Sequence, residues 1–341
     1  RIPCGPVGTG DAVAAFDHFV QREVFVENPH GFIQPRPPYQ LTASSSAPLG
    51  CAPELDGGER AQPAHLAVRS APAELPAKDQ RPLGGIRVVD LSAFWAGPIA
   101  ASMLQALGAD LVKIESHVRL DGMRWASGLR RDRRWELSPV FHAANAGKRA
   151  IALDLTTEQG RELTRRLIAD ADVVVENYSP RVMEHWGLGW DQIHDLNPRA
   201  VLTRMPAFGL DGPWRDRVGF AMTIEQVSGL ANRTGHPGDL PLMPKGVCDP
   251  IAGMHAAFAT ILALLERERT GVGQLVEVPL IETGLNAAAE QVIEWSAYGT
   301  VLERTGNRSP HAAPQGLYES AVDDVWLAVS VETSGQWEAL V

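Results

Sequence analysis

Hydrophobic and polar residues follow two different periods along the central part of the chain. Short, mostly apolar runs, the pattern of buried strands, occur at Ile86–Leu91, Leu111–Glu115, Ile151–Leu155, Val173–Val175, Ala200–Met205 and Leu275–Val278. Between them, helical patterns begin at Gly97-Pro98, pass through Leu163 and Leu167, and cover Trp190–Leu196, Asp249–Arg269 and Glu282–Tyr298. Strand and helix therefore alternate, which predicts an α/β fold with a mainly parallel, Rossmann-like sheet and flanking helices.

Two of these helices carry sequence signals at their ends. Pro98 suits the first position of a helix, and Gly108 is typical of the residue that follows the last turn. Thr156 with Gln159 three residues later fits a capping box, which predicts that the next helix begins there.

The first 82 residues have a different pattern. Residues 1–55 carry Pro-rich turns around short patterned stretches, and we expect a helix within Asp11–Glu27 whose last residues, Phe25–Glu27, run on as a strand. Residues 56–82 are rich in Ala, Pro and charged residues with weak periodicity. Such a segment is typical of a linker or of chain draped over the surface.

Composition narrows the class of protein. With 341 residues, roughly 150 per domain predicts about two domains. The 31 basic and 41 acidic residues give a net charge of −10, which argues against binding to nucleic acid. The 3 cysteines have no CxxC spacing, so we expect a reducing, cytoplasmic location and no zinc site.

We expect no membrane span and no targeting leader. The longest clean apolar run, about Ala256–Leu265, is far shorter than the roughly 18 residues that a spanning helix needs. Because the chain begins at Arg1 and patterned residues continue to Val341, we interpret the sequence as a fragment of a longer protein.

Several common active-site motifs are missing from the sequence. The turn after Asp90 reads LSAFWAGP, so it lacks the GxGxxG of dinucleotide-binding folds, and no GxxxxGK[ST] occurs. HExxH and GxSxG are also absent. NAD binding, P-loop chemistry, zinc hydrolysis and serine hydrolysis are therefore disfavoured.

Asp249 is the most informative carboxylate. It precedes Pro250 and a long apolar helix, so one interpretation is a simple N-cap with proline at the first helical position. The same place suits a nucleophile, because a helix N-terminus favours the ionised carboxylate and its free N–H groups can bind an oxyanion. Pro250 donates nothing, so Ile251, Ala252 and Gly253 would be the donors. The small residues among them would leave room for a substrate.

Several segments together resemble one known family. They are GGIRVVDLSAFWAGPIAASMLQALGADLVKIE, NAGKRAIALDLTTEQGRELTRRLIADADVVVENYSP, FGLDGPWRDR, DPIAGMHAAFATILALLERERTGVGQLVEV and RTGNRSPHAAPQGLY. From about Leu83 to Val341 the chain is similar to family III CoA-transferases of the CaiB/BaiF type. The resemblance implies a large CoA-binding catalytic domain at 83–303 and the truncated start of a smaller α+β domain at 304–341.

The resemblance also implies a mechanism. The catalytic aspartate of the family falls on Asp249, which would attack an acyl-CoA thioester and carry CoA as an aspartyl thioester to a carboxylic acid acceptor. This is covalent catalysis by a carboxylate, which divides one difficult exchange into easier steps. CoA enters only as part of the substrate, and no metal or redox cofactor is required.

The family's CoA contacts fall on residues in the turns that follow the expected strands. These positions are Trp95, Ala96, Ser116, Leu153, Asn177, Tyr178 and His185. Such turns are where parallel sheets bind ligands. We interpret Lys113, Lys148, Arg149 and Arg181 as candidates for the CoA phosphates. The competing interpretations are a packed ring for Trp95 and solvated helix or surface positions for His185 and the basic residues.

The sequence departs from two branches of the family. The racemases of the family have Gly-His-Asp where this chain has Gly219-Phe220-Ala221, which lacks the second acid or base that racemisation needs. Formyl-CoA:oxalate transferases differ at Trp95 and Ala221, and together Trp95 and Phe220 favour an apolar acyl pocket. An α-methylacyl-CoA racemase or epimerase and a non-catalytic CoA-binding half remain the alternatives to a transferase.

Residues 1–55 have a resemblance of their own. The segments IPCGPVGTGDAV, FVQREVFVENPHG, PPYQL and APLG look like the C-terminal tail of a preceding unit of the same family. We therefore interpret residues 56–82 as the linker between two fused units. The resemblance implies an interlocked homodimer or an intramolecular pseudo-dimer. In that arrangement the tail would take the place of the returning segment of the second unit and pack against residues 306–341.

Overall fold

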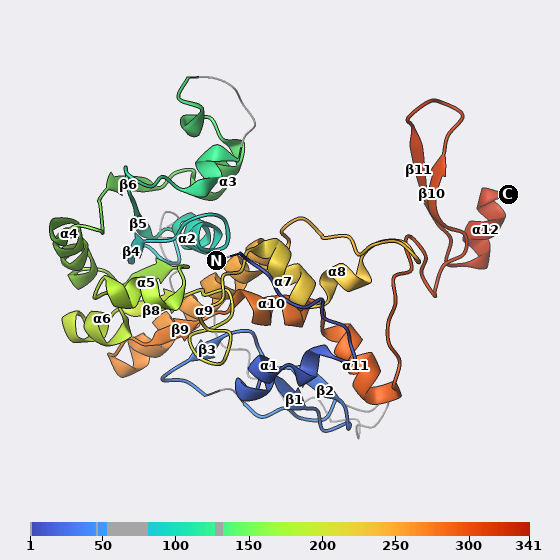
Figure 1. The fold of residues 1–341 in the computed structure, drawn as a ribbon, viewed down its shortest axis with the longest axis horizontal. Coiled ribbons are helices and arrows are strands. Elements are labelled where there is room, and N and C mark those ends of the chain that lie inside the picture. The colour runs from blue at the N-terminus through green and yellow to red at the C-terminus, as the bar shows by residue number, and fades with distance from the viewer. Residues whose placement is uncertain (1, 46, 53–80, 127–131) are drawn as a thin grey trace, which may run out of the picture.

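The main sheet positions the rest of the molecule. The computed structural model describes residues 2–45, 47–52, 81–126 and 132–341. Within them, seven strands form one sheet in the order β3-β9-β8-β7-β4-β5-β6 (Figure 1). Its strands are β3 (Gln40–Leu41), β4 (Arg87–Asp90), β5 (Asp110–Glu115), β6 (Arg149–Ala152), β7 (Val173–Glu176), β8 (Val201–Arg204) and β9 (Leu275–Glu277). Every neighbouring pair is parallel except β3–β9, so the predicted mainly parallel α/β sheet is confirmed.

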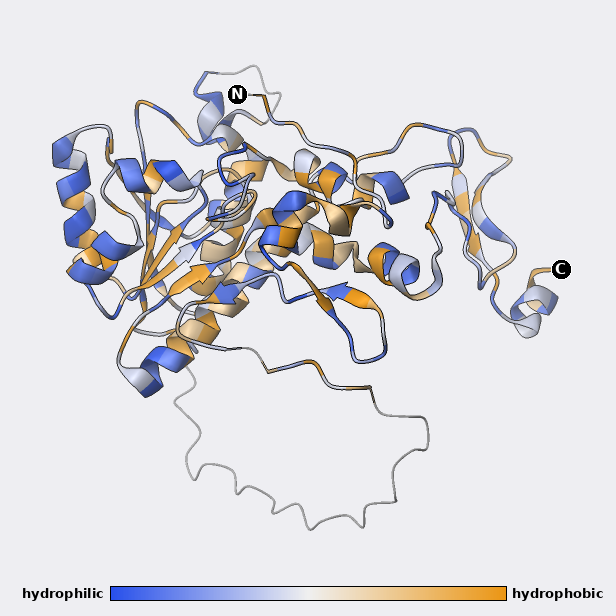
Figure 2. Ribbon diagram, turned by 60° about the horizontal axis from the view of Figure 1, so that its bottom comes forward, coloured by the Kyte–Doolittle hydropathy of each residue, from blue (hydrophilic) through white to orange (hydrophobic). Residues whose placement is uncertain are grey.

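Helices cover both faces of this sheet. All helices in the described ranges, those away from the sheet included, are α1 (Asp17–Gln21), α2 (Ala96–Ala106), α3 (Pro139–Asn145), α4 (Glu158–Ala169), α5 (Pro180–His185), α6 (Trp190–Leu196), α7 (Ala221–Val227), α8 (Leu230–Arg233), α9 (Cys248–Thr270), α10 (Leu280–Ala287), α11 (Ala289–Tyr298) and α12 (Ser334–Leu340). Short 3-10 turns lie at η1 (Val13–Ala15), η2 (Gly122–Trp125) and η3 (Arg134–Glu136). Figure 2 shows hydrophobic residues concentrated on the strands and the inner helices.

The alternation of side chains along the strands divides the core into two layers. Val173 and Val175 on β7 pack in one cluster with buried alanines of α2 and α9. Val174, between them, packs in the other cluster, with residues of α4, α5 and α6. Successive strand residues point to opposite faces, so an unbroken apolar run is what a strand covered on both faces requires.

The element boundaries differ from the sequence prediction in three places. β6 begins at Arg149 because it pairs with Val112 of β5, and Leu153 and Leu155 enter the core after the strand ends. Thr157, not Thr156, caps α4 by accepting a hydrogen bond from the Gly160 amide at 3.1 Å, so the predicted capping box of Thr156 and Gln159 is wrong. The helix expected over Glu282–Tyr298 is divided at Ala288 into α10 and α11.

Residues 2–45 form an ordered layer on the large domain. Instead of one helix, Asp11–Glu27 contains η1, α1 and strand β1 (Phe25–Glu27), which pairs with β2 (Ile33–Pro35) in an antiparallel hairpin. The hairpin lies against α11, where the Ile33 amide donates to Ser296 Oγ at 3.0 Å. β3 then adds to the edge of the main sheet beside β9.

Within one chain, the expected contact between the tail and residues 306–341 is wrong; the same contact with a second chain stays a prediction. Residues 2–45 lie against α10, α11 and β9, whereas β10 (Gln315–Glu319), β11 (Trp326–Ser330) and α12 lie apart from them (Figure 1). β10 and β11 pair antiparallel within residues 304–341, which we assigned to a smaller domain. Most of the predicted linker, residues 56–80, lies outside the described residues, and the division into 1–55, 56–82, 83–303 and 304–341 stays a prediction.

Helix α9 runs through the centre of the domain. Of the helices in the described ranges, it alone has a length and apolar composition that would suffice to cross a membrane, yet half of its apolar window is buried inside the structure. It packs against α2 and α10, as a core helix does.

Arg22 fastens the N-terminal layer to the large domain. Its side chain is 1% exposed, and the guanidinium lies 2.8 Å from both Glu277 Oε1 and Glu282 Oε1, with Asp211 as a further partner. Burial raises the pKa of Glu282, and the charges of Arg36 and Arg22 oppose that rise. Without Arg22, two neighbouring carboxylates would lose a shared buried cation.

We expect Arg22→Met to lower the free energy of unfolding by about 3–5 kcal/mol, the usual cost of breaking a buried ion pair from one side. Urea denaturation at neutral pH measures this change. The control is Arg87→Met, which removes an exposed pair with Asp170 and should cost less than about 1 kcal/mol. Equal losses for the two variants would show that the Arg22 cluster does not hold the layer in place.

Candidate active site

The order of the strands creates a ligand-binding edge. The chain runs outward from β4 to β5 and β6, then returns to β7 and continues to β8 and β9 on the other side. The carboxyl ends of β4 and β7 are therefore a topological switch point, where open α/β sheets bind ligands. Residues 92–98, which we call the β4–α2 turn, begin at this point and lead into α2.

Asp249 lies in the first turn of α9, close to the β4–α2 turn. The helix begins at Cys248 with Val247 as its N-cap, so the expectation that Asp249 itself is the N-cap is wrong. The Asp249 amide donates to Gly246 O at 3.2 Å, a hydrogen bond to the loop that precedes the helix. The side chain is buried, at 9% exposure, and among the described residues its Oδ1 has no hydrogen-bond partner. Its carboxylate is thus not used as a cap.

Glu225 on α7 is the charged neighbour of Asp249. It is fully buried, and its Oε1 accepts hydrogen bonds from the amides of Gly246 at 2.6 Å and Val247 at 2.8 Å. Burial and the charge of Glu225 raise the pKa of Asp249 to about 7, while the backbone N–H of Ala96 lowers it. A helix N-terminus is expected to favour the ionised carboxylate, but burial and the like charge outweigh such an effect here.

The loop before α9 brings Trp95 to the site. Gly246 has φ +105°, and a Cβ there would lie 2.8 Å from Cζ3 of Trp95. Glycine is needed for both reasons, the backbone conformation and the close approach of the indole ring. Trp95, whose side chain is half-buried, therefore lies beside the loop that carries Asp249.

Small residues let α2 and α9 cross closely. A Cβ on Gly253 would lie 2.8 Å from Ala96 O and 2.8 Å from Ile99 Cγ2, and Ala252 is fully buried. The idea that these small residues make room for a substrate is wrong, because α2 fills the space. The crossing places the N-terminus of α2 over the first turn of α9.

The predicted oxyanion donors are also corrected. The Ile251 amide donates to Val247 O at 3.3 Å, and the amides of Ala252 and Gly253 lie further inside the helix, where they bond to the preceding turn. The amides just before α9 are also occupied, because those of Gly246 and Val247 donate to Glu225. The Ala96 amide of α2 is the donor that faces the carboxylate.

The structure gathers most of the predicted CoA-contact residues at the same edge of the sheet. Trp95, Ala96, Ser116, Leu153, Asn177 and Tyr178 follow the carboxyl ends of β4, β5, β6 and β7. Asn177 Oδ1 accepts from the Ala93 amide at 2.8 Å, which ties two of these turns together. Leu153 is buried in the core, and Ser116 Oγ accepts from the amides of Val118 and Arg119. His185 is exposed at the end of α5, behind the turn that holds Tyr178. Their roles toward CoA stay predictions.

The candidate phosphate ligands have other partners. Lys113 and Lys148 are buried in ion pairs with Asp121 and Asp90, so neither presents its ammonium group to a phosphate on the surface. Arg149 pairs with Asp110 and Arg181 with Asp216, in both cases with the arginine exposed. The assignment of the two lysines to CoA phosphates is therefore wrong.

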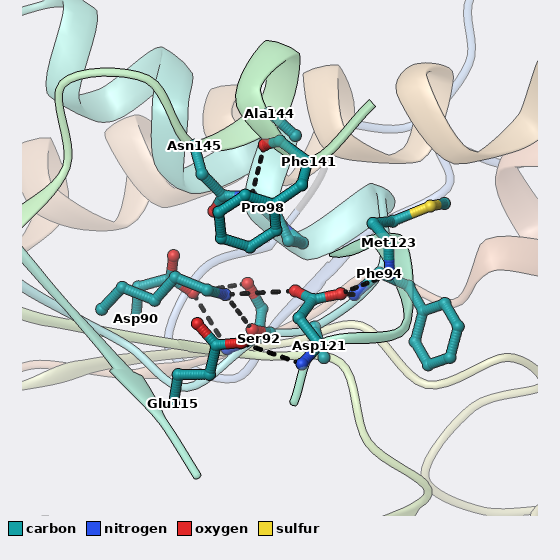
Figure 3. A network of polar contacts seen from close by, with 12 residues as sticks. Asp90, Ser92, Phe94, Pro98, Glu115, Asp121, Met123, Phe141, Ala144 and Asn145 are labelled. Atoms are coloured by element: carbon teal, nitrogen blue, oxygen red, sulfur yellow. Dashed lines mark hydrogen bonds and ion pairs between the residues drawn. The ribbon is translucent and has the colours of Figure 1, made fainter. Parts of the chain in front are cut away.

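These lysines instead belong to a buried polar network around the β4–α2 turn. Figure 3 labels their partners Asp90, Ser92, Pro98 and Asp121. Lys148 Nζ lies 2.9 Å from Asp90 Oδ2, and Lys113 Nζ lies 3.5 Å from Asp121 Oδ2. Burial opposes ionisation of Asp90, but Lys113 and Lys148 hold its pKa below the usual range. The network keeps the Asp90 carboxylate charged beneath the turn.

Sequence reasoning missed Glu225, Asp90 and Asp121. Glu225 is the only charged residue between Phe220 and Leu230, and this is the signal that could have identified it as buried. Asp90 ends an apolar strand in the same way, whereas Asp121 has no comparable signal in its local sequence.

Two further features of the described residues bear on ligands. They contain no group of three or more His, Cys, Asp or Glu side chains placed to hold a metal ion. A cavity of about 1130 Å³ lies between residues 26–49 and Leu262, Leu265 and Glu266 of α9. Asp249 and Leu262 are roughly 20 Å apart along the helix axis, so this cavity is separate from the candidate active site.

Comparison with known proteins places the chain in a family. A sequence model described as CoA-transferase family III matches residues 83–341. Succinyl-CoA–D-citramalate CoA-transferase of Chloroflexus aurantiacus is 38% identical over 251 residues, which are 73% of this chain and 61% of that protein. The alpha subunit of succinyl-CoA–L-malate CoA-transferase of the same organism is 33% identical over 303 residues, 88% of this chain and 65% of that protein.

A solved structure agrees with this placement. The crystal structure of a CAIB/BAIF family protein from Brucella suis superposes with a TM-score of 0.70 and 32% identity, and covers 76% of this chain and 69% of that one. The chain spans less than two thirds of the length of the curated relatives named above, 61% and 65%. Over residues 83–341, the sequence match, the fold and the structural likeness agree: the chain belongs to CoA-transferase family III.

Proposed function

We propose that this protein transfers CoA from an acyl-CoA donor to a carboxylic acid acceptor, with Asp249 as the nucleophile. The observation that carries the proposal is the environment of Asp249: a buried carboxylate with a pKa of about 7, set at the switch point of the sheet and faced by the Ala96 amide. A carboxylate that is half ionised near neutral pH can attack the donor as a nucleophile and can later depart as a leaving group.

The reaction proceeds through two anhydrides and one thioester. The Asp249 carboxylate attacks the thioester carbonyl of the donor, and CoA leaves as a thiolate. The thiolate then attacks the aspartyl carbonyl of the anhydride, which forms an aspartyl-CoA thioester and releases the donor acid. The acceptor carboxylate repeats these steps in reverse, so CoA ends on the acceptor and Asp249 returns to a carboxylate.

Groups around Asp249 support particular steps. The Ala96 amide is placed to donate to an oxygen on the aspartyl carbon, where negative charge develops in each tetrahedral intermediate. Glu225 raises the basicity of Asp249, which strengthens the nucleophile once it is ionised. Asn177, Tyr178 and Trp95 line the edge at which CoA would enter.

The acyl group and the assembly belong to the same proposal. The relatives named above act on succinyl-CoA, so succinyl-CoA is the first donor to test. The rings of Phe94 and Phe220 meet edge to face at 5.3 Å beside the site, and both are partly exposed, which supports an apolar acyl chain as the alternative class. A cytoplasmic location and pairing with a second CoA-transferase unit complete the proposal.

We expect a covalent adduct on Asp249 when the protein is incubated with succinyl-CoA or an aliphatic acyl-CoA. Peptide mass spectrometry should place it on the peptide containing Asp249, and hydroxylamine should remove it, because thioesters and anhydrides react with that nucleophile. The best donor in the panel would identify the acyl class.

Asp249→Asn is the matched control, since the amide keeps the shape of the carboxylate but is a poor nucleophile. It should lose the adduct and retain CoA binding. An adduct that persists in this variant would refute the assignment of Asp249. CoA binding by the wild type without any adduct or acyl exchange would favour a non-catalytic half, and α-proton exchange with deuterated water would favour a racemase.

The pH dependence of adduct formation should follow the ionisation of Asp249. Because the reactive form is the carboxylate, the rate should rise with pH to half its maximum near pH 7. Glu225→Gln removes the like charge while its amide oxygen can still accept from Gly246 and Val247, so the pKa of Asp249 should fall and the acid limb should move to lower pH.

Glu268→Gln, the same change of charge at an exposed position on α9, should leave this profile in place. A profile that is identical in wild type and Glu225→Gln would contradict the electrostatic role of Glu225.

A further inference from the structure

We infer that Asp121 is a positioning residue, which with Lys113 and Lys148 fixes the β4–α2 turn against the first turn of α9, where Asp249 lies. This inference rests on the proposed function only where it treats Asp249 as the nucleophile. The placement itself is a property of the folded chain, and Asp121 is not among the residues expected to contact CoA.

The backbone of the turn is held on both sides of Ala96. Two residues before it, the Phe94 amide donates to Asp121 Oδ1 at 3.0 Å. Two residues after it, Pro98 O accepts from Lys148 Nζ at 2.9 Å. At the start of the turn, Ser92 O accepts from Lys113 Nζ at 2.6 Å. Ala96 therefore lies between residues whose backbone is held by hydrogen bonds. Figure 3 shows the contacts of Asp121 with Phe94 and Met123.

Phe94 shows that this hold is needed. Its φ of +65° is a backbone conformation that a residue with a bulky side chain rarely adopts. Such strain persists only where surrounding contacts over-determine it, and it gathers at functional sites. Asp121 holds the Phe94 amide, and its neighbour Gly122 makes room for the ring, because a Cβ there would lie 2.4 Å from Phe94 Cε1.

Asp121 is itself locked in place. Its side chain is 1% exposed, its Oδ1 also accepts from the Met123 amide at 3.0 Å, and its own amide donates to Glu115 Oε1 at 2.9 Å. Glu115 in turn pairs with Arg124 at 2.7 Å and contributes no hydrogen bond to the turn in the described structure. Asp121 thus contacts the β4–α2 turn directly, whereas the ion pair of Glu115 with Arg124 does not.

Asp121→Ala should release the Phe94 amide and let the turn relax, so that the Ala96 N–H no longer favours the ionised form of Asp249. The charged and titratable side chains that face Asp249, Glu225 on α7 and Cys248 on α9, are unchanged by this substitution. The pKa of Asp249 should therefore rise, by about half a unit to one unit. Adduct formation at pH 6 should fall about three- to tenfold and recover at pH 9.

The direct measurement is an NMR titration of the full chain labelled with ¹³C at the aspartate carboxyl carbon. The signal of Asp249 is assigned by its loss in Asp249→Asn. Asp121→Asn, whose side-chain oxygen can still accept from Phe94 and Met123, should restore the midpoint of the wild type. Glu115→Gln weakens the pair with Arg124 and should leave the midpoint unchanged.

An unchanged midpoint in folded Asp121→Ala, or an equal shift in Glu115→Gln, would overturn the inference. If Asp121→Ala does not fold, Asn177→Ala, which frees the Ala93 amide and carbonyl of the same turn, decides in the same way. The titration needs no turnover. A raised midpoint without any acyl adduct in the wild type would refute the proposed function and leave the positioning role standing.

Discussion

The ion pair between Lys148 and Asp90 is the contact on which the candidate active site depends. Asp90 ends β4 with no exposure, so its charge is tolerated only because Lys148 and Lys113 lie beside it. Lys148 Nζ also donates hydrogen bonds to the backbone carbonyl of Pro98 and to the side-chain oxygen Oδ1 of Asn145, at the end of α3. One buried cation thereby joins the central strand, the start of α2 and the chain that leads into β6.

The fold surrounds Asp249 with groups that shift its pKa in opposite directions. The close crossing of α2 and α9 removes Asp249 from water and also presents the Ala96 amide to it. α7 adds the charge of Glu225 from the other side. Burial and like charge favour the neutral acid, and the amide favours the carboxylate. A nucleophile that must later leave needs both tendencies in balance, and three helices are required to set it.

The sequence predicted the sheet and the importance of Asp249, because both leave local signals. Apolar runs such as Val173–Val175 identify strands that are covered on two faces, and Asp249-Pro250 before an apolar segment identifies a helix terminus. The partners of these residues are not local. Glu225 reaches the loop before α9 across 21 positions, and Lys148 reaches Asp90 across 58. The phosphate role given to Lys113 and Lys148 failed for this reason: a lysine is exposed on average, and only tertiary packing shows that it is buried.

The position of Arg22 has a consequence for how the chain folds as it is made. Arg22 contacts Glu282, which lies 260 residues further along the chain. At about 5–20 residues per second, the partner emerges roughly 13–50 seconds after Arg22 has been synthesised. During that interval the β1–β2 hairpin lacks α11 to pack on, and β9 is absent as a partner for β3. Arg22 and β3 are therefore synthesised long before the residues that complete their native contacts.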